Sequence, residues 1–372
     1  MKKRVLMLSV SFSLLLGWIP VRLGFAGQAS RSVLGAKQEA ENRGYVFFPN
    51  HDEIVAHAKK EGKLRVVVNM DQATINAAIQ AFGRKYPFIK LHAVEITGAD
   101  ERSILEIKSG RASDWDIIHP RADFVSELIP YLWKADLRGM AEHGILQIPP
   151  PMIDPINRNI AAFYSRAEVV SYNKNLVPPD RVPKAWEDFL KPEFKGKKFA
   201  ADIIPTEVAC LVPVWGLEKT LQFARKLATQ QPVWVRGGSR TLRTMMAGEV
   251  PMMLGPSFHS VRRAQRKDRA DVLRYVAVEP VPVRFHSEQA ILATSSNPHA
   301  ALLWMEWMAS AESQKLADEY EPLGSSHYFR GGAVEQEIRG KKLAFVNWEH
   351  HNKLAQYQSA VFKAYGFPKA GK

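Results

Sequence analysis

Leu64-Arg-Val-Val-Val-Asn69 is a run rich in β-branched residues, and it predicts a buried strand. Apolar residues then recur at helical spacing over residues 75–82, which predicts a helix, and residues 89–94 predict a second strand. A strand, a helix and a strand with short connections are typical of a parallel sheet that carries helices on its faces. Binding sites in such sheets lie beyond the carboxyl ends of the strands. We therefore expect functional side chains in the loops that follow these strands.

The alternation of strands and helices continues along the chain and then restarts. A helix is expected at residues 102–109, a short strand at 116–118, and two extended segments at 161–165 and 169–173. A second series follows, with strands expected at 199–202, 233–235, 251–254 and 275–278 and helices at 217–228 and 239–247. The sequence therefore predicts an α/β fold built from two such units.

The last quarter of the chain predicts one more strand and two helices. Residues 289–293 are expected to form the strand, and Asn297 is expected to cap the helix that follows it. Trp304 and Trp307 belong to a regular apolar stripe on that helix, which indicates a core-facing side rather than a ligand platform. Residues 354–361 predict a final helix.

The composition is that of a globular protein. Of the 372 residues, 46% are hydrophobic and 24% are charged, which excludes disordered, collagen-like and disulfide-rich classes. The single cysteine, Cys210, allows no intrachain disulfide and lies in an apolar run, so we expect a buried side chain. The formal net charge is +13, but the densest basic stretch, residues 262–269, has no interleaved aromatic residues. We interpret that stretch as a solvated helix face and expect no nucleic-acid partner.

Residues 1–26 match the three-part pattern of a secretory signal peptide. Met1-Lys-Lys-Arg4 is positively charged, residues 5–19 are apolar, and Gly24-Phe25-Ala26 offers a cleavage site. The apolar run is shorter than the ~20 residues that a membrane-spanning helix needs. We therefore expect an exported protein in the periplasm that does not itself span the membrane, with residues 27–50 as a polar, irregular linker.

Several pieces of the sequence, taken together and in order, resemble one known family. The pieces are Glu61-Gly-Lys-Leu-Arg-Val-Val-Val68, Ala81-Phe-Gly-Arg-Lys-Tyr-Pro-Phe-Ile89, Ser113-Asp-Trp-Asp-Ile-Ile118, Tyr172-Asn-Lys-Asn-Leu-Val177, Pro183-Lys-Ala-Trp-Glu-Asp-Phe189, Pro192-Glu-Phe-Lys-Gly-Lys197, Met246-Ala-Gly-Glu-Val-Pro251 and Asn297-Pro-His-Ala-Ala301. Over residues 52–345 this combination is similar to the periplasmic solute-binding proteins of ABC importers. The branch it resembles binds ferric iron or small anions and has the type II periplasmic-binding-protein fold, close to extracellular solute-binding protein family 1.

The resemblance implies two α/β domains with a central cleft and two hinge strands. Residues 51–163 and 286–345 would form domain 1, and residues 164–285 would form domain 2. The extended segments near residues 161–173 would serve as hinge strands, and a C-terminal helix within residues 346–372 would pack on domain 1. A solute would bind in the cleft, and the domains would close over it.

The sequence departs from the iron-binding members of this branch at their metal ligands. Those members hold the metal with two adjacent tyrosines on a loop after a strand of the second domain. The matching loop here is Gly255-Pro-Ser-Phe-His-Ser260, and no two tyrosines are adjacent anywhere in the chain. Some members add a carboxylate where this chain has His119-Pro-Arg121. Because ferric ion prefers phenolate and carboxylate oxygens, we expect a small organic or phosphorus-containing anion as the ligand. An iron or metal chelate is the alternative, and no cofactor or resident metal is expected.

An anion site is expected near Gly237-Gly-Ser-Arg-Thr241, at the start of a predicted helix. Free backbone N–H groups and the helix dipole attract negative charge there, and arginines can clamp an oxyanion with paired hydrogen bonds. The candidate ligand-binding residues are Asn69, Asp71, Gln72, Thr97, His119, Arg121, Thr206, Arg236, Ser239, Arg240, Ser257 and His259. The alternatives are structural: the arginines as surface charges, His259 as a buried core histidine, and Asp71 as a helix cap.

Two other function classes remain open at this stage. An enzyme is disfavoured because the chain has no Gly-x-Ser-x-Gly elbow, no His-Glu-x-x-His, no Walker loop and no Cys-x-x-Cys. A periplasmic sensor that reports its ligand to a membrane signalling partner would have the same fold. The sequence-based expectation is a monomer that delivers a small-molecule ligand to an ABC permease in the inner membrane.

Overall fold

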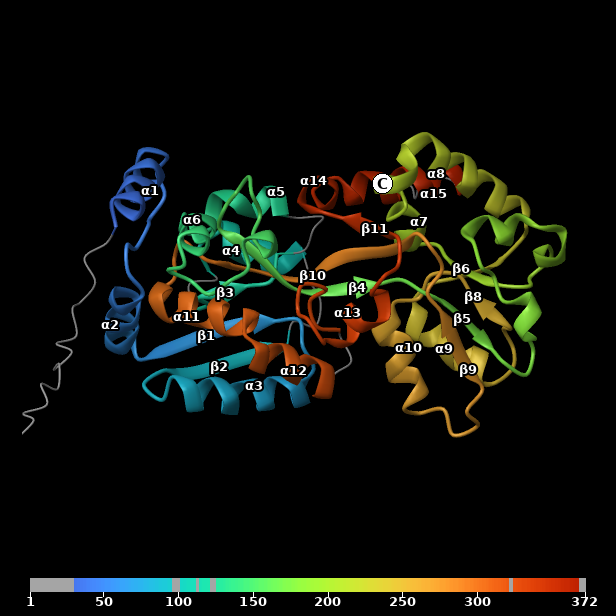
Figure 1. Cartoon of the computed structure of the whole chain (residues 1–372), viewed down its shortest axis with the longest axis horizontal. Helices are drawn as coiled ribbons and strands as arrows, with labels where there is room; N and C mark the ends of the chain where they lie inside the picture. The colour runs from blue at the N-terminus through green and yellow to red at the C-terminus, as the bar shows by residue number, and fades with distance from the viewer. Residues whose placement is uncertain (1–29, 96–100, 112–113, 121–124, 321–323, 368–372) are drawn as a thin grey trace, which may run out of the picture.

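The computed structural model describes residues 30–95, 101–111, 114–120, 125–320 and 324–367. The strands form two sheets, one in each half of an elongated molecule, with helices against both of them (Figure 1). The predicted signal peptide and the candidate residues Thr97 and Arg121 lie outside the described residues. Among the described helices, none is both long and apolar enough to cross a membrane.

The first sheet contains the strands that the sequence predicts for the first unit. Its order is β11-β10-β3-β1-β2, and β4 also pairs with β10. The strands are β1 (Lys63–Val68), β2 (Lys90–Glu95), β3 (Ile117–Ile118), β4 (Ile160–Ala167), β10 (Val281–Ile291) and β11 (Leu343–Val346). As predicted, β1 pairs in parallel with β2 and β3. The long strand β10 runs antiparallel to both β3 and β4.

The helices of this half lie around the sheet, and most of them share one large apolar core. They are α1 (Arg31–Asn42), α2 (His51–Glu61), α3 (Gln72–Lys85), α4 (Glu101–Lys108), α5 (Val125–Leu128), α6 (Leu137–Glu142), α11 (Pro298–Ala309), α12 (Ala311–Tyr320) and α13 (Ala333–Ile338). Trp304 and Trp307 of α11 are buried in this core beside Phe82 of α3. The predicted core-facing stripe is therefore confirmed. Gly62 ends α2 in the left-handed conformation, with φ 67°, as its position predicts.

The second sheet has the order β7-β6-β8-β5-β9. Its strands are β5 (Val170–Asn173), β6 (Ala200–Asp202), β7 (Val233–Val235), β8 (Met252–Met253) and β9 (Leu273–Val276), and the helices around it are α7 (Thr206–Ala209), α8 (Val212–Thr229), α9 (Gly238–Met246) and α10 (Phe258–Gln265). Single 3-10 turns at Ile129–Tyr131, Pro150–Met152, Pro179–Arg181, Trp186–Leu190 and Pro192–Phe194 complete the connections. Cys210 is fully buried between α7 and α8, as predicted.

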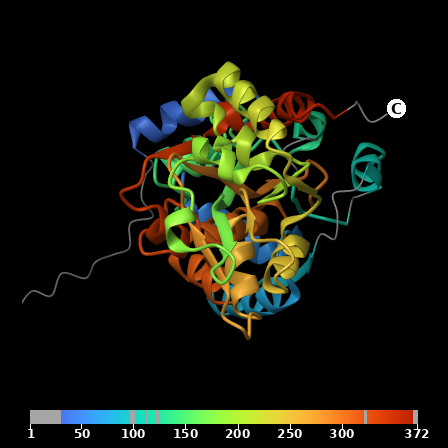
Figure 2. The same cartoon turned by 90° about the vertical axis from the view of Figure 1, so that its right-hand side faces the viewer.

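The two ends of the chain differ from the expectations for them. Residues 31–42 form α1 rather than an irregular linker, because Ser30 caps the helix and Val33 and Ala40 pack into the first core. The C-terminal helix was expected on the first domain, but α15 (Leu354–Ala364) packs on α7 and α8 in the second half. Leu354, Val361 and Tyr365 are buried there, in an apolar cluster that includes residues of α8 and also Ala344 and Val346 of the edge strand β11. Both views place this red helix beside the yellow-green α8 (Figures 1 and 2).

The chain passes between the two halves at three places. At Glu168 and Val169 it leaves β4 and enters β5, and between β9 and β10 it returns. These sheet changes lie a few residues from the domain limits expected near residues 164 and 286. The third passage follows β11, where α14 (Trp348–His351) leads into α15. The central cleft lies beside these passages.

Candidate functional site

A cleft of about 410 Å³ lies where the two halves of the molecule meet. The first half contributes the ends of β1, β3 and β4 and the middle of β10. The second half contributes the segment before α7, and the chain's C-terminal segment adds a further wall. The lining residues are Asn69, His119, Arg166, Ile204, Thr206, Arg284, His286, Glu288, His351, Leu354, Ala355 and Gln358. The volume is in the range of natural small-molecule sites.

The floor of the cleft comes from one face of β10 and from its neighbour β4. Arg284, His286 and Glu288 are alternate residues of β10, which places them along one line. Arg166 of β4 lies directly opposite Arg284 in the antiparallel register. Two like charges in that position destabilise a sheet. Ser287, between two of these residues, has φ 60°, a left-handed conformation that costs a non-glycine residue about 1–3 kcal/mol and is typical of functional sites.

The two opposed arginines differ in how their charge is balanced. Arg284 Nε donates to Glu168 Oε1 at 3.0 Å; the Glu168 side chain is buried, and that of Arg284 is 17% exposed. Burial lowers the pKa of Arg284, but the ion pair with Glu168 outweighs this and leaves the pKa raised. Arg166 has no carboxylate within salt-bridge distance among the described residues. Its Nη2 is 2.9 Å from His286 Nε2, and its buried Nε has no hydrogen-bond partner.

Burial, together with the nearby charge of Arg284, lowers the pKa of Arg166 to about 9. The guanidinium therefore still carries its charge at neutral pH, but at a cost in free energy. The pKa of His286 is well below its ordinary value, because the ring is buried and faces Arg166. A neutral His286 accepts the hydrogen bond from Arg166 at Nε2, which leaves the ring hydrogen on Nδ1. Among the described residues, Arg166 has no acidic side chain at ion-pair distance, although Glu168 and Glu288 act on its pKa from further away.

Glu288 contributes a carboxylate to the cleft, with histidines on both sides of it. His351 Nε2 lies 3.2 Å from Glu288 Oε1, and His119 Nδ1 lies 2.6 Å from the Glu288 carbonyl oxygen and 4.0 Å from its carboxylate. Burial lowers the pKa of His351, although Glu288 acts in the opposite direction. The two histidines lie close to Glu288, which is itself one of the residues that line the cleft.

The opposite wall is mainly neutral. Thr206, at the start of α7, accepts a hydrogen bond of 2.7 Å at Oγ1 from Gln358 Nε2 of α15. Ile204, Leu354 and Ala355 line the same wall with apolar side chains. The cleft therefore has a charged floor and a wall that combines apolar groups with a hydroxyl and an amide. Such a site suits a solute with a negatively charged group and an organic part.

The sequence matches the model of one protein family, the bacterial extracellular solute-binding proteins, over residues 77–326. That match spans more than half of the chain. The chain belongs to this family. A comparison with curated proteins finds no match.

Solved structures of several periplasmic proteins share the fold of this solute-binding protein. Iron-bound HitA from Pseudomonas aeruginosa has a TM-score of 0.61 and 18% identity, covering 82% of this chain and 99% of that one. Apo ferric ion-binding protein A from Pasteurella haemolytica has a TM-score of 0.63 and 18% identity, covering 83% and 100%. The Trichodesmium protein IdiA (FutA), in complex with iron and citrate ligands, has a TM-score of 0.61 and 20% identity, covering 82% and 99%. These likenesses confirm the predicted type II periplasmic-binding fold with two α/β domains. Identities this low do not extend to the ligand.

Three of the residues predicted for the site of this solute-binding protein line the central cleft: Asn69, His119 and Thr206. Asn69 Nδ2 lies 3.4 Å from His286 Nε2. His259 is buried behind the cleft, where its ring stacks at 6.5 Å on that of His286. Ser257 lies next to the passage between the sheets, because it bridges to Glu168, and its Oγ is 2.9 Å from Ser260 Oγ.

Two predicted residues after β1 have local structural contacts instead. Asp71 caps α3, accepting hydrogen bonds from the backbone N–H and the hydroxyl of Thr74. Gln72 is exposed and donates to Asn76 on the same helix. The loop that corresponds to the tyrosine loop of the iron binders carries His259. Among the described residues, no group of three or more histidine, cysteine and acidic side chains is placed to hold a metal ion.

The predicted anion site at the start of α9 is separate from the central cleft. Arg236 and Arg240 line a smaller pocket of about 280 Å³ together with Thr244, and both arginines and Ser239 are exposed. The N–H of Gly237 already donates to Asp202 Oδ2 at 2.9 Å. The carboxylate of Asp202 therefore occupies part of the donor set that the sequence suggested for a solute.

Sequence reasoning missed Arg166, Arg284, His286, Glu288, His351 and Gln358. A signal for three of them was present, because Arg284-Phe-His-Ser-Glu288 places polar residues at every second position of an apolar segment. The expected strand began at residue 289, so this pattern was not recognised as a strand. Arg166, His351 and Gln358 have no comparable local signal.

Proposed function

We propose that this solute-binding protein captures a small organic or phosphorus-containing anion in the central cleft and delivers it to an ABC-type importer in the inner membrane. The observation that carries the proposal is the partly buried guanidinium of Arg166, whose buried Nε has no hydrogen-bond partner and whose Nη2 faces a neutral histidine. An isolated buried charge is costly, and an oxyanion that accepts hydrogen bonds from it would remove that cost. Asn69, His119 and Thr206 would add polar contacts from both halves.

The setting of this function follows from the family and the sequence. Its members are extracellular, and residues 1–26 are predicted to be a signal peptide, so the mature protein would act as a monomer in the periplasm. Two domains joined by crossing strands suit closure over a bound solute. The importer's permease would then recognise the closed form. Catalysis plays no part in this proposal.

The test is ligand-dependent thermal unfolding of the mature protein (residues 27–372) and two arginine variants. The ligands are inorganic phosphate, methylphosphonate, phenylphosphonate, citrate and ferric citrate. A ligand at 100 times its Kd stabilises the native state by about 2.7 kcal/mol, and each kcal/mol raises Tm by roughly 2–4 °C in domains of this size. We expect at least one of these anions to raise Tm in the wild type.

The variants decide between the two arginine sites. Arg166→Gln should remove most of the increase in Tm, because a charge-assisted hydrogen bond contributes about 1.5–3 kcal/mol, or 10- to 100-fold in Kd. Arg240→Gln should leave the increase in Tm unchanged. The opposite pattern would move the site to the start of α9. A response to ferric citrate but not to citrate would favour an iron chelate, and no response to any anion would contradict the proposal.

A further inference from the structure

We propose that the C-terminal segment, residues 347–365, forms one wall of the solute site and contributes to binding. In this proposal Gln358 of that segment contacts an organic anion bound at Arg166. This inference rests on the proposed function and deepens it in two ways. It adds a residue to the site from a part of the chain that lies outside the family match at residues 77–326. It also narrows the ligand class from anions in general to anions with an organic group.

The first argument is the periodicity of the segment. Leu354, Ala355 and Gln358 of α15 are one, three and four residues apart, so they lie on one side of that helix, and all three line the cleft beside His351, the last residue of α14. Val361 and Tyr365 continue this face further along α15, where they enter the core of the second half. The remaining face is turned outward.

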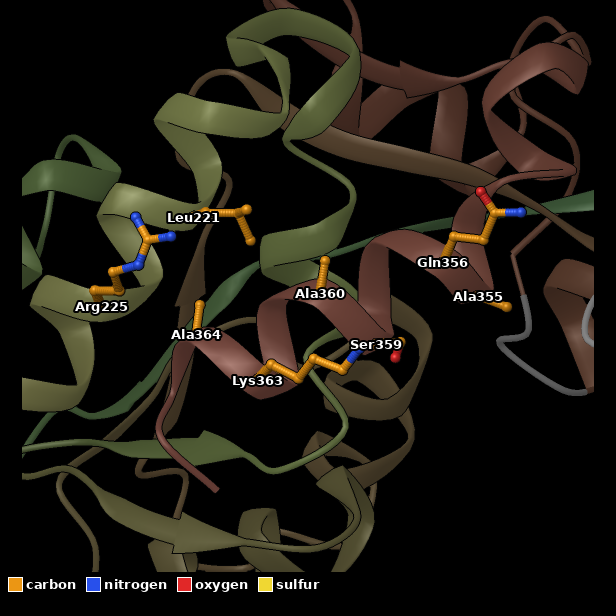
Figure 3. Close-up of a pocket in the computed structure, with 8 residues that line it drawn as sticks. All are labelled: Leu221, Arg225, Ala355, Gln356, Ser359, Ala360, Lys363 and Ala364. Atoms are coloured by element: carbon orange, nitrogen blue, oxygen red, sulfur yellow. The ribbon is translucent and has the colours of Figure 1, made fainter. Parts of the chain in front are cut away.

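The outward face of α15 lines a shallow groove between α15 and α8 (Figure 3). Gln356, Ser359 and Lys363 line that groove opposite Arg225. Gln356 and Gln358 are therefore two identical side chains on one helix, of which one lines the outer groove and the other the cleft.

The second argument is that the segment is held on both sides of the cleft. On the side of the first half, Trp348 Nε1 donates to the Pro151 carbonyl at 3.0 Å, and the Trp348 ring stacks on Phe285 at 4.6 Å. On the side of the second half, α15 packs on α7 and α8. These anchors fix the cleft-facing residues in place, which is what a specific site requires.

The third argument concerns the chemistry of the wall. Gln358 Nε2 donates one hydrogen to Thr206 Oγ1 at 2.7 Å. The Thr206 oxygen therefore acts as an acceptor, and its own hydrogen is left to donate to a solute. The second N–H of Gln358 is likewise available, so the pair can offer two donors to an oxyanion without adding a charge.

The apolar part of the wall indicates what else the solute carries. Leu354 and Ala355 belong to the same face as Gln358, and Ile204, about half exposed at 49%, adjoins them in the cleft. Leu354 is already buried in the core, but an inorganic oxyanion would leave the exposed Ala355 and the half-exposed Ile204 without an apolar partner. An anion with an organic group would bury them, with its charged end at Arg166 and its carbon part against this wall.

The experiment compares Gln358→Glu with Gln356→Glu, which introduces the same charge on the same helix outside the cleft. Kd values for phosphate, methylphosphonate, phenylphosphonate and citrate are measured by calorimetry on the full mature protein, and unliganded Tm reports folding. We expect an organic anion to bind the wild type at least 10-fold more tightly than phosphate. Its Kd should rise at least 10-fold in Gln358→Glu and less than 2-fold in Gln356→Glu. If Gln358→Glu lowers the unliganded Tm, Gln358→Met replaces it, and the loss of the amide alone should weaken binding about 3- to 10-fold.

The outcomes separate this inference from the proposed function. If none of the four anions binds the wild type, the proposed function is wrong and this inference falls with it. If an anion binds and Arg166→Gln weakens it while Gln358→Glu and Gln358→Met do not, the proposed function stands and the role of the C-terminal segment is overturned. Tighter binding of phosphate than of the organic anions would overturn the ligand class.

Discussion

His327 is a residue whose surroundings determine its charge. Its ring packs against Tyr328 at 3.9 Å and Phe345 at 4.5 Å, and Nδ1 lies 2.7 Å from Ser165 Oγ. Burial in this aromatic setting lowers the pKa of His327 to about 4. In the unfolded chain the pKa of histidine is about 6.5.

This difference predicts a loss of stability in mild acid. Between pH 6.5 and about 4 the unfolded chain binds a proton at His327 that the folded protein does not, so the free energy of unfolding falls as the pH falls. His327→Gln should show a shallower slope over that window in urea unfolding at a series of pH values. His259 and His286, whose pKa values are also lowered by burial, will leave part of the slope in the variant. Equal slopes in both proteins would contradict this prediction.

At the residue scale, the sequence predicts roles that depend on neighbours along the chain. Asp71 as a helix cap was among the alternatives, and a buried Cys210 was expected from its apolar run. The sequence could not distinguish the role of Arg166 from that of Arg240, because the two arginines differ only in their burial and in their contacts. Arg166 lies opposite Arg284 through strand pairing, and no local pattern contains that pairing.

Among the helices, the start of α11 shows how a cap can come from a distant part of the chain. Asn297 was expected to cap this helix, but its Nδ2 donates to both carboxylate oxygens of Asp116 at 3.1 Å. Glu61, at the end of α2, caps α11 instead. Its two carboxylate oxygens accept hydrogen bonds from the backbone N–H groups of His299 and Ala300, at 3.2 and 2.7 Å.

Glu61→Ala should therefore destabilise the protein through α11. Loss of an N-cap costs about 0.5–2 kcal/mol, and the charge of Glu61 at a helix N-terminus places this case toward the upper end. Lys60→Ala, at an exposed position of the same helix, is the control and should change the free energy of unfolding by less than about 0.5 kcal/mol. Urea unfolding measures both variants. A Glu61→Ala loss no larger than that of the control would show that other acceptors or water satisfy the N–H groups at the start of α11.

Across the whole molecule, the sequence predicts two α/β units because each unit is built from local strand–helix alternation. The cleft between them depends on contacts between distant segments, namely the pairing of β4 with β10 and the docking of α15 on α8. The helical spacing of residues 354–361 predicts a helix, but an apolar face alone does not say which domain it covers. That is why half of the cleft's lining was outside the reach of sequence reasoning.

Glu168 connects the stability of the whole molecule to the charge of its cleft. It lies at the passage between the two sheets, where its N–H donates to the Pro282 carbonyl and its carboxylate balances Arg284. Glu168→Gln would leave two opposed, partly buried guanidinium groups with no carboxylate at ion-pair distance among the described residues. Removing one partner of a buried ion pair costs about 3–5 kcal/mol, so we expect a lower free energy of unfolding in the absence of solute.

A bound anion should stabilise the same variant more than it stabilises the wild type, because the anion would then neutralise both arginines. The increase in Tm at a saturating concentration of the anion should be larger in Glu168→Gln, although its unliganded Tm is lower. The control is Glu335→Gln, which breaks an exposed pair with Arg339 and should alter neither value appreciably. An equal or smaller increase in Tm in Glu168→Gln would mean that the anion does not interact with Arg284. The solute would then lie away from the strand pair that joins the two halves, and closure of the cleft would have to be driven by contacts on its outer walls.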